Sequence, residues 1–288
     1  MSRPSTRFLD TEVPDLPPEK ARFHVLPVPY EKTVSYGHGT ALGPGAIIAS
    51  SGQLERFDGT SDPGAEGIYT WPAVDCSGAP ERVIAAIALA VGRILKLKKI
   101  PVVLGGEHTV TWGVIKGYLD AGEKDFGVVQ IDAHADLRDA YEGDKYSHAS
   151  VMRRVVESGV PLVQLGNRAY CEEEREARKA HKVLAHDAVD LVPRNVSKIK
   201  LPKKFPSKVF FTVDVDGIDP SVLPATGTPV PGGLGWYQTL GLFESVARQR
   251  KIIGFDVMEF APIPGFHAFD FAAALLTYKM MGIVQRSS

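Results

Sequence analysis

The sequence has few cysteines and no long apolar run, and each absence narrows the possible functions. Its two cysteines, Cys76 and Cys171, are far apart and lack CxxC spacing, which argues against a disulfide framework and a thiolate zinc site. The first twenty residues contain no apolar core of a signal peptide, and the longest apolar run, Val83 to Val91, is too short to span a bilayer. We therefore expect a cytoplasmic protein without a membrane segment.

An excess of positive charge is also missing. The 288 residues include 33 basic and 34 acidic side chains, which gives a net charge of −1. A general nucleic-acid binder needs a basic excess to displace counterions. The composition is otherwise that of an ordinary globular protein, so we expect no nucleic-acid partner.

Short apolar runs alternate with helical patterns along the chain, and no internal repeat or long linker divides it. The runs that predict strands are 23–29, 100–106, 126–132, 161–166, 208–216 and 251–259. The patterns that predict helices are 81–96, 110–118, 149–157, 172–180, 236–248 and 269–281. Strands that are apolar on both faces and alternate with helices indicate a parallel sheet that is covered on both sides.

Acidic and histidine residues follow four of the predicted strands. These strand ends read GGEH (105–108), DAHAD (132–136), DVDGIDP (214–220) and DVME (256–259). Ligands of parallel sheets bind beyond the carboxyl ends of the strands, and residues two apart on an extended segment point the same way. We therefore expect the alternating acidic and histidine residues to converge. The six candidate metal ligands are His108, Asp132, His134, Asp136, Asp214 and Asp216.

Six ligands are too many for one tetrahedral ion, but they suit two ions if some carboxylates bridge. Oxygen-rich ligation without sulfur favours manganese or magnesium over structural zinc, while zinc, cobalt and iron stay as alternatives. A lone DxD motif is weak evidence for a metal site, because acidic residues commonly form turns at strand ends. His108 alone would indicate a hydrogen-bonded interior histidine. Burying three ionisable groups after an apolar strand is costly without a metal or tight pairing, so the whole pattern predicts a metal site.

These blocks resemble those of the arginase/agmatinase ureohydrolase family, and are most similar to agmatinase. The resemblance runs from PVPYEKTVSYGHGTALGPGAI (27–47) through GGEHTVTWG, DAHADLRDAYEGDKYSHAS and DVDGIDPSVLPATGTPVPGG to FDVMEF. It implies a single three-layer α/β/α domain over residues 1–288 with a mostly parallel central sheet, in which residues 1–20 form an extended N-terminal segment. It also implies a homo-oligomer, commonly a trimer or hexamer.

The same resemblance implies two manganese ions per chain and a division of the ligands between them. One ion would take His108, Asp132, Asp136 and Asp214, and the other would take Asp132, His134, Asp214 and Asp216. Asp132 and Asp214 would therefore bridge. Two such ions lower the pKa of a shared water, and the resulting hydroxide would attack the guanidinium carbon of a small-molecule substrate and release urea.

A charge count supports this chemistry. Four carboxylates cancel the charge of two divalent ions, so a bridging hydroxide leaves a slightly negative core, which suits a guanidinium better than a phosphoester. In the family, the residue matching Glu259 grips the guanidinium and the one matching His148 shuttles a proton to the leaving amine. The alternatives are that Glu259 pairs with a nearby arginine and that His148 only packs at a helix start.

The loop after DAHAD bears on the substrate. Arginases recognise the carboxylate and amine of arginine with a polar loop at this place, whereas here it reads LRDAYEGDKY (137–146) and is similar to agmatinase-like members. Its acidic balance suits agmatine, which would be cut to putrescine and urea. Arg138 could pair with Asp139 or Glu142, or hold a substrate carboxylate, which would favour guanidinobutyrate or formiminoglutamate. Aminopropylagmatine, arginine, a non-catalytic metal-binding scaffold and a single-zinc deacetylase stay open.

Overall fold

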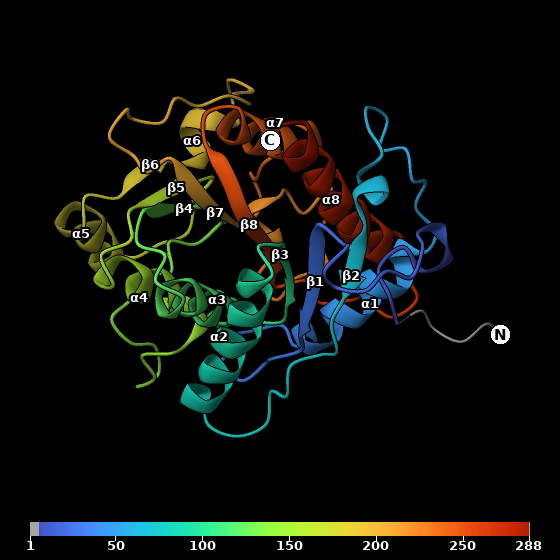
Figure 1. Cartoon of the computed structure of the whole chain (residues 1–288). Coiled ribbons are helices and arrows are strands. Elements are labelled where there is room, and N and C mark those ends of the chain that lie inside the picture. Colours follow the sequence, from blue (N-terminus) through green and yellow to red (C-terminus); the bar gives the residue numbers. More distant parts are fainter. Residues whose placement is uncertain (1–5, 288) are drawn as a thin grey trace.

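The computed structural model describes residues 6–287 and places the strands of this range in one parallel sheet (Figure 1). The strand order is β2-β1-β3-β8-β7-β4-β5-β6, and every neighbouring pair is parallel. The strands are β1 Phe23–Val28, β2 Ile68–Thr70, β3 Ile100–Gly105, β4 Phe126–Ile131, β5 Leu162–Leu165, β6 Leu184–His186, β7 Lys208–Asp214 and β8 Lys251–Met258.

Helices cover both faces of this sheet, as Figure 1 shows. Helices α2 to α4 pack together on one face, and α1, α7 and α8 pack together on the other. The three-layer α/β/α fold predicted from the sequence is confirmed. The helices are α1 Gly43–Ser51, α2 Pro80–Lys96, α3 Thr109–Asp120, α4 Val151–Glu157, α5 Glu172–Ala180, α6 Ala188–Leu191, α7 Trp236–Ala247 and α8 His267–Arg286. Short 3-10 turns are η1 Asp10–Glu12, η2 Thr40–Leu42, η3 Pro63–Glu66, η4 His148–Ser150 and η5 Val215–Gly217.

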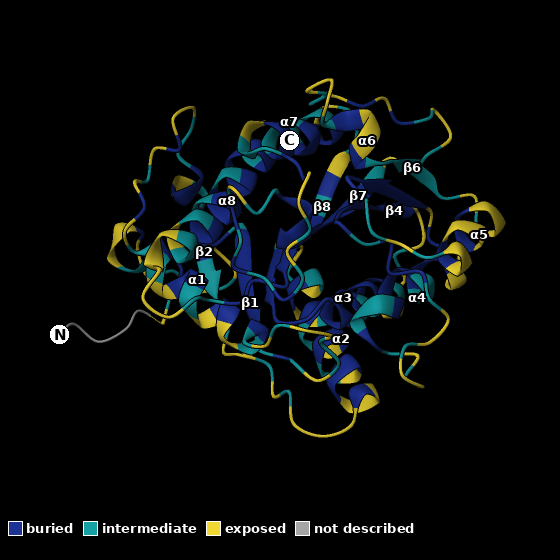
Figure 2. Cartoon of the chain, turned by 180° about the vertical axis from the view of Figure 1, so that it is seen from behind, coloured by how far each residue is buried: buried dark blue, intermediate teal, exposed yellow. Residues whose placement is uncertain are grey.

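Successive residues of the central strands enter two separate hydrophobic cores. On β7, Phe210 packs with the residues of α2 to α4, whereas Phe211 packs with those of α7 and α8. On β4, Val128 and Val129 divide in the same way, and all four side chains are fully buried. Figure 2 shows the buried strands between two helical layers. Because a buried phenylalanine or valine contributes about 1.5–3 kcal/mol, burial on both faces explains why these strands carry apolar residues on both faces.

The sequence pattern did not mark the two edge strands β2 and β6, the short helix α6 and the helix α1. Helix α1 has nine residues and packs against α8 and β3, but it begins with Gly-Pro-Gly. Of the segment 1–20, residues 1–5 lie outside the described range, while Phe8 and Leu9 are buried and Asp10–Glu12 forms a 3-10 turn. No helix within residues 6–287 is long and apolar enough to cross a membrane.

The carboxyl ends of four neighbouring central strands, β3, β8, β7 and β4, meet at one edge of the sheet. The ends of β3 and β8 are tied together where Glu259 N–H donates to the Gly106 carbonyl at 2.8 Å. A Cβ atom at Gly106 would lie 2.0 Å from the Tyr30 carbonyl oxygen, so only glycine fits there. The GGEH, DVME, DVDGIDP and DAHAD blocks are therefore brought to a common edge.

Candidate metal centre

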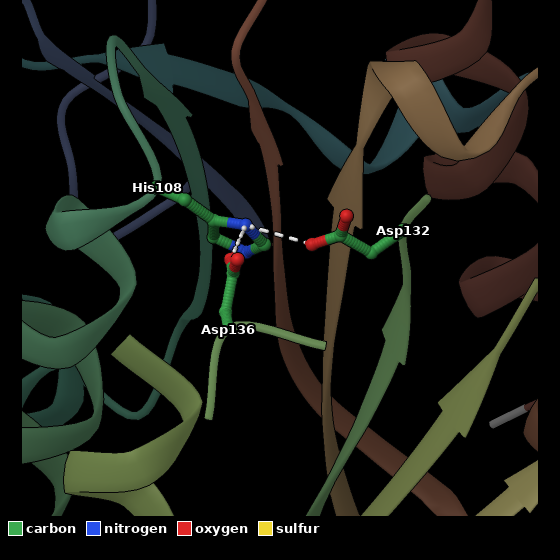
Figure 3. A group of neighbouring side chains, drawn as sticks. All are labelled: His108, Asp132 and Asp136. Atoms are coloured by element: carbon green, nitrogen blue, oxygen red, sulfur yellow. Dashed lines mark ion pairs between the residues drawn. The ribbon is translucent and has the colours of Figure 1, made fainter. Parts of the chain in front are cut away.

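The first group of side chains surrounds one imidazole nitrogen. His108 Nδ1 lies 3.1 Å from Asp132 Oδ2, 3.2 Å from Asp136 Oδ2 and 3.2 Å from Asp214 Oδ2. Figure 3 shows His108 between Asp132 and Asp136, with their carboxylates directed at the ring. Two ligand atoms about 2.1 Å from one ion, at a right angle to each other, are about 3.0 Å apart. The spacing of this group therefore matches the first shell of a small divalent cation.

The second group lies next to the first and shares a residue with it. His134 Nδ1 lies 3.0 Å from Asp216 Oδ2 and 3.7 Å from Asp132 Oδ1. The ligand-capable atoms of His134, Asp132 and Asp216 all lie within 4.8 Å of one another. Asp132 thus turns one carboxylate oxygen toward each group, which is the arrangement that a bridging ligand requires.

Only part of the predicted alternation along extended segments is observed. Asp132 directly follows β4, His134 forms a parallel β-bridge with Ala169, and Asp214 ends β7. Asp136 converges because its backbone is left-handed, with φ of 53°. Asp216 sits in the η5 turn, where its N–H donates to Asp214 Oδ1 at 2.9 Å. Left-handed backbone at a residue other than glycine is costly and gathers at functional sites.

Neighbouring polar side chains orient the candidate ligands. His108 Nε2 contacts Thr212 Oγ1 at 2.9 Å, which leaves Nδ1 directed at the three carboxylates. Gln130 donates to Asp132 Oδ2 at 2.6 Å, and Asp216 Oδ1 accepts from Ala133 N–H at 3.0 Å. Such outer contacts fix the tautomer and rotation of metal ligands and increase their affinity for the ion.

The charges of the two groups shift each other's pKa values. Burial and then Asp132 raise the pKa of Asp136 to about 7, and burial and then Asp216 raise the pKa of Asp214 well above its usual range. Burial alone would lower the pKa of His134, but Asp216 and Asp132 outweigh it and raise that pKa to about 12. The raised pKa values mean that these neighbouring carboxylates are ionised together only when a positive charge lies close to them.

The donor set fits two oxygen-preferring divalent cations. His108 Nδ1 is buried and has no hydrogen-bond partner, although three carboxylate oxygens face it. A cation between these four atoms would satisfy the nitrogen and neutralise the carboxylates together. The sulfur atoms of Cys76 and Cys171 are in neither group, in agreement with the absence of a thiolate motif.

Glu259 lies beside the two groups in a narrow cavity that Asp214, Asp216 and His134 also line. Its Oε1 accepts a hydrogen bond from His108 N–H at 2.7 Å, and its backbone is left-handed with φ of 62°. Burial and then Glu107 raise the pKa of Glu259 well above its usual range. The alternative of an arginine partner gains no support, because no ion pair of Glu259 is found within the described part of the chain.

His148 begins the turn η4 and borders both this cavity and a wider one of about 360 Å³ outside it. Its Nδ1 lies 3.1 Å from Thr33 Oγ1 and its Nε2 lies 2.9 Å from Ser35 Oγ. Tyr141 packs edge-on against the ring at a centroid distance of 5.6 Å. Burial, followed by His108 and His134, lowers the pKa of His148 to about 4.

The outer cavity contains Arg138, whose guanidinium lies 5.7 Å from the Tyr141 ring centroid. Neither expected carboxylate partner holds it, since Asp139 pairs with Arg154 at 3.2 Å and no ion pair of Arg138 is present within residues 6–287. Tyr170 lines the other side of the cavity. Two aromatic rings and one unpaired cation therefore surround the space through which the far end of a substrate would extend.

Several residues that border the site were not predicted from the sequence. Thr33 and Ser35 belong to the PVPYEKTVSYGHGT segment, and Thr228 belongs to the segment after DVDGIDP, but no role was predicted for them. The sequence feature that could have pointed to them is their position inside the blocks that resemble the ureohydrolase family. Small hydroxyl residues in loops are too common to be singled out without the fold.

The chain is similar to known proteins in sequence and in fold over most of its length. The sequence profile of the arginase family matches residues 21–282. An N(1)-aminopropylagmatine ureohydrolase of Synechocystis sp. is 39% identical over 267 residues, which cover 90% of this chain and 87% of the relative. An agmatinase of Pyrococcus horikoshii is 30% identical over 285 residues, which cover 97% and 98%. The crystal structure of an agmatine ureohydrolase of Thermoplasma volcanium has a TM-score of 0.85 at 29% identity and covers 98% of this chain and 95% of that one.

Proposed function

Because this chain belongs to the arginase family, we propose that it hydrolyses the guanidinium of agmatine to putrescine and urea with two manganese ions per chain. The observation that carries this proposal is the pair of ligand groups that share Asp132 beside Glu259 and His148. The pair supports two ions rather than the single zinc of a deacetylase. Once bound, the ions would supply a hydroxide nucleophile near neutral pH.

The proposed ligands are the six residues predicted from the sequence. His108, Asp132, Asp136 and Asp214 would hold one ion, and Asp132, His134, Asp214 and Asp216 would hold the other. Asp132 faces both imidazoles, with Oδ2 3.1 Å from His108 Nδ1 and Oδ1 3.7 Å from His134 Nδ1, and this supports its bridging role. Asp214 Oδ2 faces His108, but no ion pair of Asp214 with His134 is present within the described residues, so its bridging role rests on the family resemblance.

Glu259 would orient the substrate. Its Oε1 is fixed by His108 N–H, which leaves the second carboxylate oxygen for the guanidinium that enters the narrow cavity. A carboxylate and a planar guanidinium form charge-assisted, directional hydrogen bonds. This contact would hold the guanidinium carbon at the two ligand groups, and correct placement of reacting atoms accounts for much of a catalytic rate.

His148 would move the proton. Its ring is neutral near pH 7 because burial lowers its pKa, so Nε2 can take a proton from the attacking water. The same atom can return that proton to the nitrogen of the departing amine.

Aminopropylagmatine is the second candidate substrate. Relatives that are 39% and 35% identical are named N(1)-aminopropylagmatine ureohydrolase, and the outer cavity of about 360 Å³, which Tyr141 and Tyr170 line, gives room for a longer polyamine. The guanidinium groups of Arg138 and Arg178 already lie over these two rings, at 5.7 Å and 4.2 Å from their centroids. The unpaired Arg138 is the feature that would instead favour a carboxylate, as in guanidinobutyrate.

A urea-release assay with manganese tests the proposal across agmatine, aminopropylagmatine, guanidinobutyrate and arginine. We expect the highest kcat/KM with agmatine or aminopropylagmatine. A higher kcat/KM with guanidinobutyrate would show that Arg138 binds a carboxylate and would correct the substrate. Absence of urea from all four by the manganese-loaded protein would contradict the proposal and favour a scaffold. A cytoplasmic location and a trimeric or hexameric assembly remain predictions.

A further inference from the structure

Glu107, the acidic residue of the GGEH block outside the proposed ligand set, is fully buried among hydrogen-bond donors. Its Oε2 accepts from the backbone N–H groups of Lys32 at 2.5 Å and Thr33 at 2.6 Å. Its Oε1 accepts from the hydroxyl groups of Thr33 and Thr109, each at 2.7 Å. Two backbone N–H groups and two hydroxyl groups therefore surround this carboxyl group, and its oxygens are the acceptors in all four contacts.

The Thr33 hydroxyl has one proton, and Glu107 determines where that proton points. In the 2.7 Å contact the Thr33 hydroxyl donates to Glu107 Oε1, so its proton points away from His148. The Thr33 oxygen is then left only as an acceptor. It faces two nitrogens of His148, the backbone N at 3.0 Å and the ring Nδ1 at 3.1 Å.

A ring nitrogen that faces an acceptor must carry the proton itself. The Nδ1 of His148 is therefore protonated in the neutral ring, and Nε2 keeps its lone pair. Nε2 lies 2.9 Å from the Ser35 hydroxyl, which can donate to it. In the other tautomer Nε2 would already hold a proton and could not take one from an attacking water.

We propose that Glu107, acting through Thr33, is a positioning residue that fixes His148 in the Nδ1–H tautomer. Nε2 is then the unprotonated nitrogen that accepts the transferred proton and returns it. The proposal rests on the proposed function, in which His148 is the proton shuttle. It assigns Glu107 and Thr33 no contact with the substrate. Hydrogen bonds to the second nitrogen of an imidazole are a common way to choose the nitrogen that reacts.

The competing explanation is that Glu107 only holds the loop of residues 32–35 in place. The two explanations differ in their dependence on His148. A tautomer effect acts on the chemical step through that ring and disappears when the ring is removed. A loop effect moves Ser35 and the cavity wall as well, and therefore persists without the ring.

Thr33→Val removes the hydroxyl at nearly constant volume, and Thr33→Ser restores it. On the manganese-loaded enzyme, we expect Thr33→Val to lower kcat roughly tenfold to hundredfold, with KM and metal content within about threefold of wild type. Thr33→Ser should recover most of this loss. Thr109→Val is the matched control, because it removes the other hydroxyl from the same Glu107 oxygen at the same distance. This hydroxyl also lies 3.0 Å from the Tyr146 carbonyl, and it has no hydrogen bond to His148 within the described part of the chain. Thr109→Val should lose less kcat than Thr33→Val.

Glu107→Gln gives a second, independent perturbation. The backbone N–H groups of Lys32 and Thr33 still need an acceptor, so the glutamine oxygen should face them and its NH2 should face the Thr33 hydroxyl. The hydroxyl is then free to donate to Nδ1, which reverses the tautomer. We expect a loss of kcat at least as large as that of Thr33→Val, again with bound metal.

The double variants with His148→Ala decide between the explanations. Once His148 is absent, Thr33→Val or Glu107→Gln should lower kcat by less than about twofold, because coupled residues are not additive. An equal loss with and without the ring would overturn the tautomer role. Full kcat in Thr33→Val, alongside a large loss in His148→Ala, would overturn it while the shuttle role stands. Full kcat in His148→Ala would overturn both, and the metal site and its hydrolysis would remain.

Discussion

Replacing Glu259 by glutamine exchanges a carboxyl group, which a bound guanidinium would hold in its ionised form, for a neutral amide of almost the same volume. The side chain is 7% exposed, and its Oε1 accepts from His108 N–H at 2.7 Å. The amide oxygen of glutamine can keep that contact and the left-handed backbone. The second oxygen, which we assign to the guanidinium, becomes an NH2 group. Two sets of donors then face each other across the narrow cavity.

The expected loss has two parts. A hydrogen bond to a charged group contributes about 1.5–3 kcal/mol, and a buried donor left without an acceptor costs about 1–3 kcal/mol. Taken together, about 2.5–6 kcal/mol corresponds to a fall in kcat/KM of roughly seventyfold to twenty-thousandfold. Both kcat and KM should change, because the contact forms on binding and also positions the reacting carbon.

Urea release at several substrate concentrations gives kcat and KM, and elemental analysis gives the manganese content of the same sample. Glu244→Gln is a matched control, because Glu244 pairs with Arg248 at 2.7 Å on the surface of α7, where ion pairs contribute little. A metal-loaded Glu259→Gln enzyme with kcat/KM within about threefold of wild type would refute the assigned role of this glutamate.

Three further predictions concern the metal and the fold. Chelation should abolish urea release and lower the melting temperature, and added manganese should restore both, because a ligand at a hundred times its Kd stabilises a fold by about 2.7 kcal/mol per site. Full activity in metal-free protein would exclude the mechanism. Asp132→Ala should lose both ions whereas His108→Ala should mainly weaken one, and metal counts that are equally low in the two variants would contradict the shared position of Asp132. Asp219→Ala should lower the free energy of unfolding by about 1–3 kcal/mol in a denaturant titration and leave the metal content intact, because this carboxylate accepts hydrogen bonds from Ser221 and two loop N–H groups. Since the Ser221 side chain and these backbone contacts lower the pKa of Asp219 to about 2, its contribution should be complete above about pH 4 and be lost as the pH falls toward 2; an unchanged difference between variant and wild type at pH 2.5 would contradict this origin.

The central elements could be predicted because their patterns are strong and local. The helix expected over 172–180 is α5 as observed, and the strand expected over 251–259 is β8 with one residue fewer. Strands β2 and β6 were missed because three residues at a sheet edge are too few to form a pattern. The order of the strands could not be predicted either, because pairing depends on contacts between distant segments.

For the site, the residue types and their places after strands were enough to gather the six candidate ligands. The sequence could not supply the left-handed backbone of Asp136 or the η5 turn, since both depend on the packed surroundings. It also could not relate Thr33 to His148, which are 115 residues apart and meet only across the folded cavity. Contacts between residues this far apart leave no periodic pattern in the sequence.

The position of β8 in the sheet has a consequence for the order in which the site can form during synthesis. Within residues 6–287, β8 follows all the other strands in sequence, yet it pairs with β3 on one side and β7 on the other. A nascent chain that has reached residue 250 has all the proposed metal ligands, but lacks the strand that joins His108 to Asp214. The two halves of the sheet can therefore be joined only after β8 has left the ribosome, and high-affinity metal uptake should follow the pairing of β8 rather than precede it.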